Sequence, residues 1–331
     1  MINRRFIVVP IIAVLVSISL LVSSMGTNNT FSASDGGMQG LTSSPSAELA
    51  PIALTLYKTY TGHYGYVTAG IGVRNTGRGT ISLVLPRGTS LTAAYLYWII
   101  LDNTTPNSNN NKIVINGILV TGTLIGSGPS PCWTPPKGYT YRAWVYDQLS
   151  QAEGRYGTSY GLEVGGMRSN MTDGQSPWKT AGGAPMAESV HLVLVYSDSA
   201  IPSSVIKIYN GYFESSGGTA TFAYAWPARA SGTALFSHLT ADGQATSVTP
   251  FAKSIDFTGP TAITTTIDKA NTLNGRDPSI TSKATYEGSL ADTNTYNVGS
   301  LVPLAGGASA ITYNLDGDCI SWAAMIFATG Q

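Results

Sequence analysis

The stretch LTAAYLYWIIL, from Leu91 to Leu101, is apolar on both of its alternating faces. Successive side chains of a strand point to opposite sides of the sheet. One set is Leu91, Ala93, Tyr95, Tyr97 and Ile99, and the other is Ala94, Leu96, Trp98 and Ile100. A strand that is apolar on both sides is covered on both. The stretch therefore predicts a central strand packed between two layers.

Further strand-forming segments recur along the chain, while long amphipathic helical segments do not. The strongest are ISLVL at Ile81, YTYRAWVY at Tyr139, SVHLVLVY at Ser189, VIKIY at Val205, TATFAYAW at Thr219 and ISWAAMIFAT at Ile320. We therefore expect an all-β fold, a large antiparallel β-sandwich or jelly-roll-like domain. We assign Trp98, Trp144 and Trp322 to its core because they lie inside strand patterns.

Two Asn-Gly pairs lie between apolar runs, Asn116-Gly117 and Asn210-Gly211. Both residue types tolerate the positive φ that a two-residue hairpin turn of the primed type requires. The sequence predicts a hairpin at each.

The charge composition of the chain argues against some classes of function. The 331 residues hold 18 Lys and Arg against 18 Asp and Glu, and only 11% are charged, where a typical soluble domain has about 25%. Without a basic excess there is no surface to neutralise phosphates, so nucleic acid is not an expected partner. These values are typical of an exported β-rich protein.

The N-terminus carries an export pattern. Arg4 and Arg5 precede an apolar run from Phe6 to Met25, which fits either a cleaved signal peptide or a retained membrane anchor. We expect residues 1–33 to be that segment, residues 34–50 a flexible Ser/Gly-rich spacer, and residues 51–331 one sandwich domain, with a subdivision near Gly217 as the alternative. The body would lie at the cell surface or outside the cell, in contact with the membrane only through its N-terminal segment.

The two cysteines, Cys132 and Cys319, are most simply one structural disulfide in an oxidising compartment. The alternative is two unrelated buried thiols, because spacing alone does not decide pairing.

The segment YNLDGDC offers carboxylates at Asp316 and Asp318, which suggests a calcium site at a strand end. Its glycine does not fall where the EF-hand pattern requires it, so the alternative is a polar turn. We expect no other cofactor. The three histidines, His63, His191 and His238, are too scattered to predict a zinc site.

Surface modification and ligand contact are predicted at loop residues. Asn103 and Asn170 begin N-x-[ST] sequons and are candidate glycosylation sites. Trp133 and Trp178 lie in Pro-rich or polar loops and are candidate contact residues for a sugar ligand, because aromatic rings present large amphipathic contact surfaces. No catalytic residue is assigned, and we do not expect an enzyme.

The chain contains the strings LPRGTSLTAAYLYW from Leu85, PCW from Pro131, YTYRAWV from Tyr139, HLVLVYSD from His191, IKIYNGY from Ile206, TADGQ from Thr240 and DCISWAAMIFATG from Asp318. Taken together, they resemble a poorly characterised family of exported bacterial and archaeal surface proteins of β-sandwich type. The resemblance implies an adhesin-like protein at the cell surface or secreted, and it implies no catalytic residue.

Three functions follow from these observations. The leading one is a non-enzymatic structural or adhesive surface protein that assembles with copies of itself, in which the strand IALTLYKTY from Ile52 pairs with a neighbouring subunit. The second is a carbohydrate-binding module that uses exposed Trp and Tyr to bind surface glycans. A secreted hydrolase is the third, and it would require two carboxylates facing each other in a cleft.

Overall fold

The computed structural model describes residues 41–42, 54–74, 76–103, 109–130, 139–149, 159–169, 184–229, 232–243, 253–269, 273–275 and 290–330. Within these ranges the chain forms the strands β1 to β19 and no helix, and every strand pairing is antiparallel. The all-β prediction is confirmed, and the strands form four sheets.

The first two sheets form a jelly roll from the first half of the chain. The first inner sheet has the order β3 (Tyr64–Gly72), β11 (Met186–Ser197), β5 (Ser90–Asp102), β9 (Thr140–Tyr146), β8 (Thr123–Pro129). The first outer sheet has the order β4 (Gly79–Val84), β10 (Ser159–Gly165), β6 (Lys112–Ile115), β7 (Ile118–Thr121). The chain repeatedly crosses between the two sheets, as a jelly roll requires.

The other two sheets repeat this strand order in the second half. The second inner sheet has the order β17 (Ala291–Asn297), β14 (Ala234–Ala241), β19 (Cys319–Thr329), β12 (Ser204–Ser216), β2 (Thr55–Gly62). The second outer sheet has the order β1 (Leu41–Thr42), β13 (Thr219–Trp226), β18 (Gly307–Asn314), β15 (Ser254–Thr258), β16 (Thr264–Asp268). Apart from β1 and β2, these strands follow one another along the chain as a second jelly roll.

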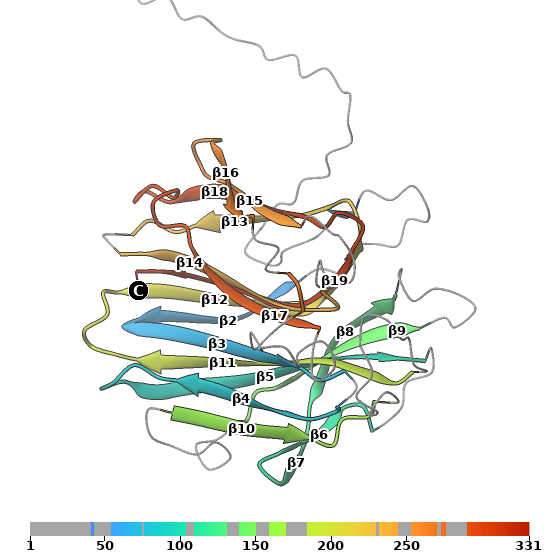
Figure 1. Ribbon diagram of the computed structural model, residues 1–331. Helices are drawn as coiled ribbons and strands as arrows, with labels where there is room; N and C mark the ends of the chain where they lie inside the picture. The colour runs from blue at the N-terminus through green and yellow to red at the C-terminus, as the bar shows by residue number, and fades with distance from the viewer. Residues whose placement is uncertain are drawn as a thin grey trace, which may run out of the picture.

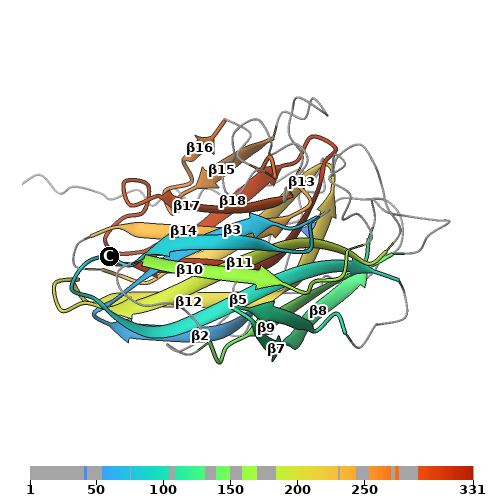
Figure 2. The ribbon, with the colours of Figure 1, turned by 60° about the horizontal axis from the view of Figure 1, so that its bottom comes forward.

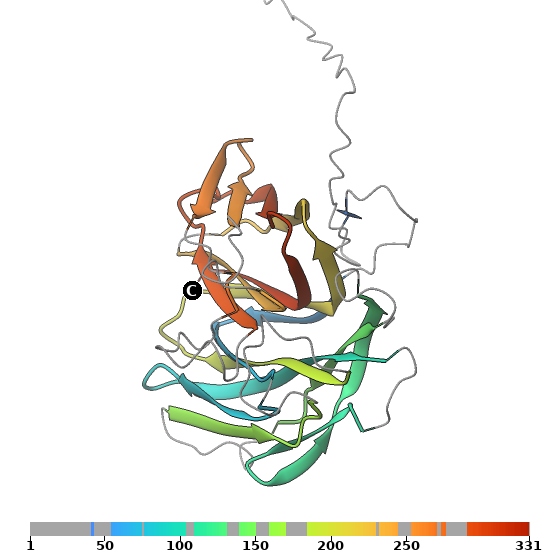
Figure 3. The same ribbon diagram turned by 45° about the vertical axis from the view of Figure 1, so that its right-hand side comes forward.

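The four sheets lie in a stack, with the inner sheets facing each other (Figure 1), and Figure 3 shows the layers from another direction. Three apolar cores fill the stack. The first core lies between the two sheets of the first jelly roll, the central core between the two inner sheets, and the second core between the two sheets of the second jelly roll.

Strand β5 has the two-sided burial that its sequence predicts. Tyr95, Tyr97, Ile99 and Leu101 pack in the central core, and Ala94, Leu96, Trp98 and Ile100 pack in the first core. Figure 2 shows β3, β11, β5 and β9 side by side in the first inner sheet. Trp98, Trp144 and Trp322 are all buried, as expected.

Strand β2 ties the two jelly rolls together. It precedes the first jelly roll in sequence, yet it pairs with β12 of the second, with Tyr60 opposite Ile206. The strand IALTLYKTY, expected to pair with a neighbouring subunit, thus pairs within its own chain over its described part. Residues 198–203 connect β11, the last strand of the first jelly roll, to β12, the first full strand of the second after them in sequence. Gly217, the alternative point of subdivision, lies in the turn between β12 and β13.

The two Asn-Gly predictions have opposite outcomes. Asn116 and Gly117 have φ of 48° and 86° and join β6 to β7, with Ile115 opposite Ile118, so this hairpin is confirmed. The hairpin at Asn210-Gly211 is wrong. These residues lie inside β12, where the register against β19 shifts between Asn210 and Phe213. The residues of β12 on both sides of this shift pair with β19, so the extra residue in β12 forms a β-bulge.

Candidate functional site: an ion-paired cluster between the jelly rolls

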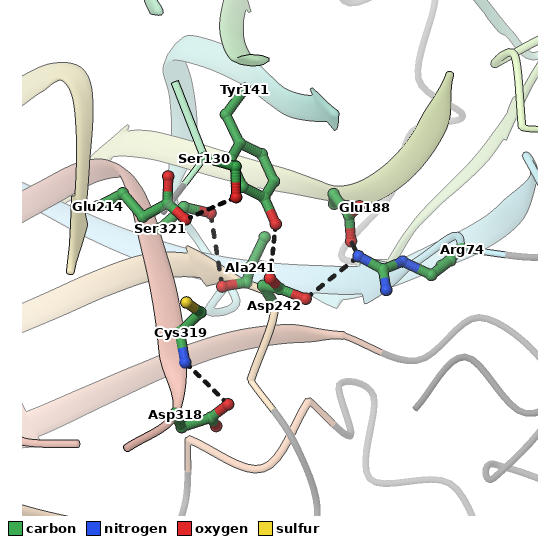
Figure 4. A network of polar contacts seen from close by, with 10 residues as sticks. All are labelled: Arg74, Ser130, Tyr141, Glu188, Glu214, Ala241, Asp242, Asp318, Cys319 and Ser321. Atoms are coloured by element: carbon green, nitrogen blue, oxygen red, sulfur yellow. Dashed lines mark hydrogen bonds and ion pairs between the residues drawn. The ribbon is translucent and has the colours of Figure 1, made fainter. Parts of the chain in front are cut away.

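A buried polar cluster, which we call the junction cluster, bridges the two inner sheets at one end of the central core (Figure 4). Arg74, after β3, and Glu188, on β11, belong to the first jelly roll, while Asp242, after β14, belongs to the second. Arg74 Nη2 lies 2.5 Å from Glu188 Oε2 and 3.1 Å from Asp242 Oδ1. One guanidinium thus faces two carboxyl groups, one from each jelly roll.

Two tyrosines extend this cluster. The Tyr141 hydroxyl donates to Asp242 Oδ2 at 2.5 Å, again across the two inner sheets. The Tyr212 hydroxyl donates to Glu214, whose other oxygen accepts from Ser130 Oγ at 3.3 Å. The Tyr141 and Tyr212 rings stack with centroids 6.0 Å apart, so the two groups form one continuous network.

Burial raises the pKa of two carboxyl groups of this network, Glu188 and Glu214. It raises the pKa of Glu188 from 4.5 to about 8, with Asp242 adding to the rise and Arg74 opposing it. Burial likewise raises the pKa of Glu214 well above its ordinary value. Burial lowers the pKa of Arg74, but Glu188 and Asp242 outweigh it, and the net shift is upward. Burial and the neighbouring Asp242 thus make Glu188 easier to protonate than an exposed glutamate, while the two carboxyl groups keep Arg74 charged.

A second polar contact, the hydroxyl seam, joins the inner sheets along β3 and β17. The imidazole of His191, on β11, contacts Thr293 Oγ1 at 2.7 Å and Ser189 Oγ at 2.9 Å. Tyr66 and Thr295 both hydrogen-bond Ser237. His191 is fully buried, so its imidazole is a hydrogen-bonding group of the interior between the two inner sheets.

The opposite side of the central core carries a tyrosine cluster. Tyr57 and Tyr60 of edge strand β2 and Tyr64 of edge strand β3 are half-buried and pack against this core. The Tyr57 hydroxyl donates to Asp147 Oδ2 at 2.5 Å, and its ring meets Tyr95 edge-on. The Tyr60 and Tyr95 hydroxyls are in direct contact. These half-exposed rings form a surface that the sequence analysis did not single out.

The two predicted calcium ligands, Asp316 and Asp318, differ in their burial and in their contacts. Asp316 is exposed, with φ of 50°, whereas Asp318 is buried and forms an ion pair with Lys253 Nζ. Within the described ranges, no group of three or more His, Cys, Asp or Glu side chains could hold a metal ion. Lys253 already supplies the positive charge that faces Asp318.

The remaining predicted site residues divide by position. Asn103 directly follows β5 and is exposed, so its side chain lies at the surface. Its backbone carbonyl accepts a hydrogen bond from Arg142 Nη1 at 3.1 Å. Asn170, Trp133 and Trp178 lie outside the described residues. Their predicted roles as a glycosylation site and ligand contacts stay predictions, as does glycosylation of Asn103.

The cysteines and the N-terminal segment are described only in part. Cys319 is buried at the start of β19. Cys132 lies outside the described residues, so its pairing with Cys319 stays a prediction. Residues 1–40 are likewise outside them, and no helix in the described part of the chain is long and apolar enough to span a membrane.

Comparisons with known proteins give weak similarities only. No protein family and no curated protein matches the chain. A solved structure of Sulfolobus Turreted Icosahedral Virus aligns at 11% identity over 83% of this chain and 91% of that chain, with a TM-score of 0.24. A turret structure with a triple jelly roll from an archaeal virus aligns at 14% identity over 79% and 59%, with a TM-score of 0.18.

A β-porphyranase of glycoside hydrolase family 86 from Bacteroides plebeius aligns at 10% identity over 85% of this chain and 36% of that chain, with a TM-score of 0.25. At such TM-scores none of these alignments bears on what this chain does. The chain's own strand order defines it as a tandem, stacked jelly-roll protein.

Proposed function

We propose that this protein is a non-enzymatic structural or adhesive protein of the cell surface or extracellular space, and that it associates with copies of itself. The main support comes from the contacts that the buried carboxyl groups form. The carboxyl groups of the junction cluster bind a guanidinium and tyrosine hydroxyls across the two jelly rolls. Because these carboxyl groups are buried and occupied by contacts with one another's partners, they support a structural role over a catalytic one.

Self-association is supported by an apolar edge in the first jelly roll. Strand β7 is the edge of the first outer sheet and β8 the edge of the first inner sheet, and they follow each other along the chain. Ile118 and Leu119 on β7 and Leu124 on β8 are exposed, Leu119 by 63%. Edge strands offer unpaired backbone groups, and exposed apolar side chains on them favour pairing with another chain.

Sedimentation analysis tests this assembly. The wild-type chain should form oligomers as its concentration rises, and Leu119→Lys should shift it to monomer. The matched control is Ile263→Lys, which places the same charge at an equally exposed apolar residue between β15 and β16. A wild-type chain that stays monomeric at every concentration would contradict self-association.

Location is tested separately by fractionating the source cells and sequencing the N-terminus of the mature chain. Recovery at the surface or in the medium supports the proposed location, and a folded cytoplasmic pool would overturn it. The N-terminal residue decides between a cleaved signal and a retained anchor.

The tyrosine cluster favours carbohydrate binding as a second candidate function. Half-exposed rings at Tyr57, Tyr60 and Tyr64 beside Asp147 combine apolar surface with hydrogen-bonding groups. A glycan array should then show binding that Tyr57→Ala and Tyr64→Ala weaken. An array without a binding glycan would contradict this candidate and leave the structural proposal to its own test.

A further inference from the structure

The contact between Lys253 and Asp318 is chemically unlike the other buried ion pairs. Lys253 directly precedes β15, and Asp318 directly precedes β19, which belongs to the opposite sheet of the second jelly roll. Each side chain is only 1% exposed, and Nζ is in direct contact with Asp318 Oδ2. Lys253 is the one lysine among the buried residues in the described part of the chain.

The surroundings of this pair exclude water. Ile255, Leu315 and Ile320, which flank it along the chain, are all buried in the second core. The turn between β18 and β19 fixes Asp318, because its N–H donates to Leu315 O at 3.0 Å and its carbonyl accepts from Gly217 N at 2.8 Å. An amine and a carboxyl group are thus held together in a dry site, where burying two charges is expensive.

The other carboxyl oxygen is held by a backbone donor. The Cys319 N–H donates to Asp318 Oδ1 at 2.9 Å. If Nζ attacks Cγ, negative charge develops on Oδ1, and this N–H is placed to stabilise it, as a donor in an oxyanion hole does. The contact between Nζ and Oδ2 provides a direct path for protons.

From this geometry we propose that Lys253 and Asp318 condense spontaneously to an amide, an isopeptide bond that joins the two sheets of the second jelly roll. The bond forms between Nζ and Cγ, and the bond between Cγ and Oδ2 breaks. Oδ2 leaves as water and carries two of the three protons of the lysine ammonium. The products are one neutral amide and one water, so the step needs no oxidant or other co-reactant.

Proximity and desolvation favour this condensation. A lysine amine becomes a nucleophile where it is desolvated, and fixed contact with the reacting carbon replaces a bimolecular encounter. Condensation also removes both buried charges. The pair of Arg74 and Glu188 is equally buried but does not provide the same chemistry, because its guanidinium stays protonated.

Mass spectrometry of the reduced, trypsin-digested full chain tests the proposal. Trypsin does not cleave at an acylated lysine, so residues 230–269 should remain one peptide, joined to residues 284–331. The joined species should weigh one water molecule less than the two peptides together. Recovery of residues 230–253 and 284–331 as separate, unmodified peptides from the wild-type chain would overturn the proposal.

Two variants complete the experiment. Lys253→Arg keeps a positive charge but provides no amine nucleophile, and Asp318→Ala removes the carboxyl carbon. Both should yield the 284–331 peptide unlinked. The wild-type digest decides the question even if either variant fails to fold, because the linked peptide is detected in the natural chain alone.

Discussion

Arg74 of the first jelly roll donates from Nη2 to Asp242 Oδ1 of the second across 3.1 Å, and the same nitrogen contacts Glu188 Oε2. These residues lie at one end of the central core, where the inner sheets meet (Figure 4). A single cation thus joins the two halves of the stack through contacts with both.

Replacing Arg74 with Met should destabilise the protein strongly. The substitution keeps most of the side-chain volume but leaves two buried carboxyl groups without their cation. Breaking a buried pair in this way costs about 3–5 kcal/mol. Urea unfolding at neutral pH measures the loss, with Arg87→Met at an exposed position as the control. Equal stabilities for the two variants would show that the junction cluster contributes little to folding.

Glu188 should make the protein less stable as the pH rises. Its folded-state pKa of about 8 lies above the ordinary 4.5, so its contribution is fully present below 4.5 and is lost as the pH rises through 8. As the pH rises from 4.5 to 8, the free energy of unfolding of the wild type should therefore fall relative to that of Glu188→Gln. Glu163→Gln, at an exposed site, should show no such trend, and a parallel trend in both variants would refute the assignment.

The histidines predict the opposite trend on the acid side. Burial lowers the pKa of His191 and of His238 from 6.5 to about 3. A depressed folded-state pKa contributes stability that is present above 6.5 and is lost as the pH falls through 3. His191→Gln should lose less stability than wild type over this range when both are unfolded in urea. His63→Gln, at an exposed residue, should follow the wild-type curve.

The sequence predicts much of the fold because strand burial has a short period. The two apolar faces of β5 show directly in the alternation of Tyr95 and Leu96, and both were assigned correctly. Asn210-Gly211 shows the limit of such local patterns. Its residues are as suited to a turn as Asn116-Gly117, but pairing with β19, which lies more than a hundred residues further on, continues the strand.

The junction cluster and the Lys253 contact could not be predicted in the same way. Arg74 and Asp242 are 168 residues apart, and nothing in their immediate sequence marks them as buried. Asp318 does stand out, but its spacing from Asp316 suggests a calcium ligand. Only the folded structure, in which the start of β15 lies beside the start of β19, shows that the Lys253 ammonium group faces Asp318.

Gly70 should be intolerant of any side chain, because β3 lies against the hydroxyl seam there. A Cβ at this position would lie 2.7 Å from His191 Nδ1 and closer still to Thr293 Oγ1. Overpacking of this kind costs about 1–3 kcal/mol, so Gly70→Ala should lower the free energy of unfolding by that amount. Gly161→Ala is the matched control, because this strand glycine has open space where its Cβ would lie. Adding Thr293→Ala to Gly70→Ala should restore part of the loss by removing the nearest atom. A Gly70→Ala chain as stable as the Gly161→Ala chain would show that the inner sheets can move apart at this seam, and that their packing is looser than these contacts indicate.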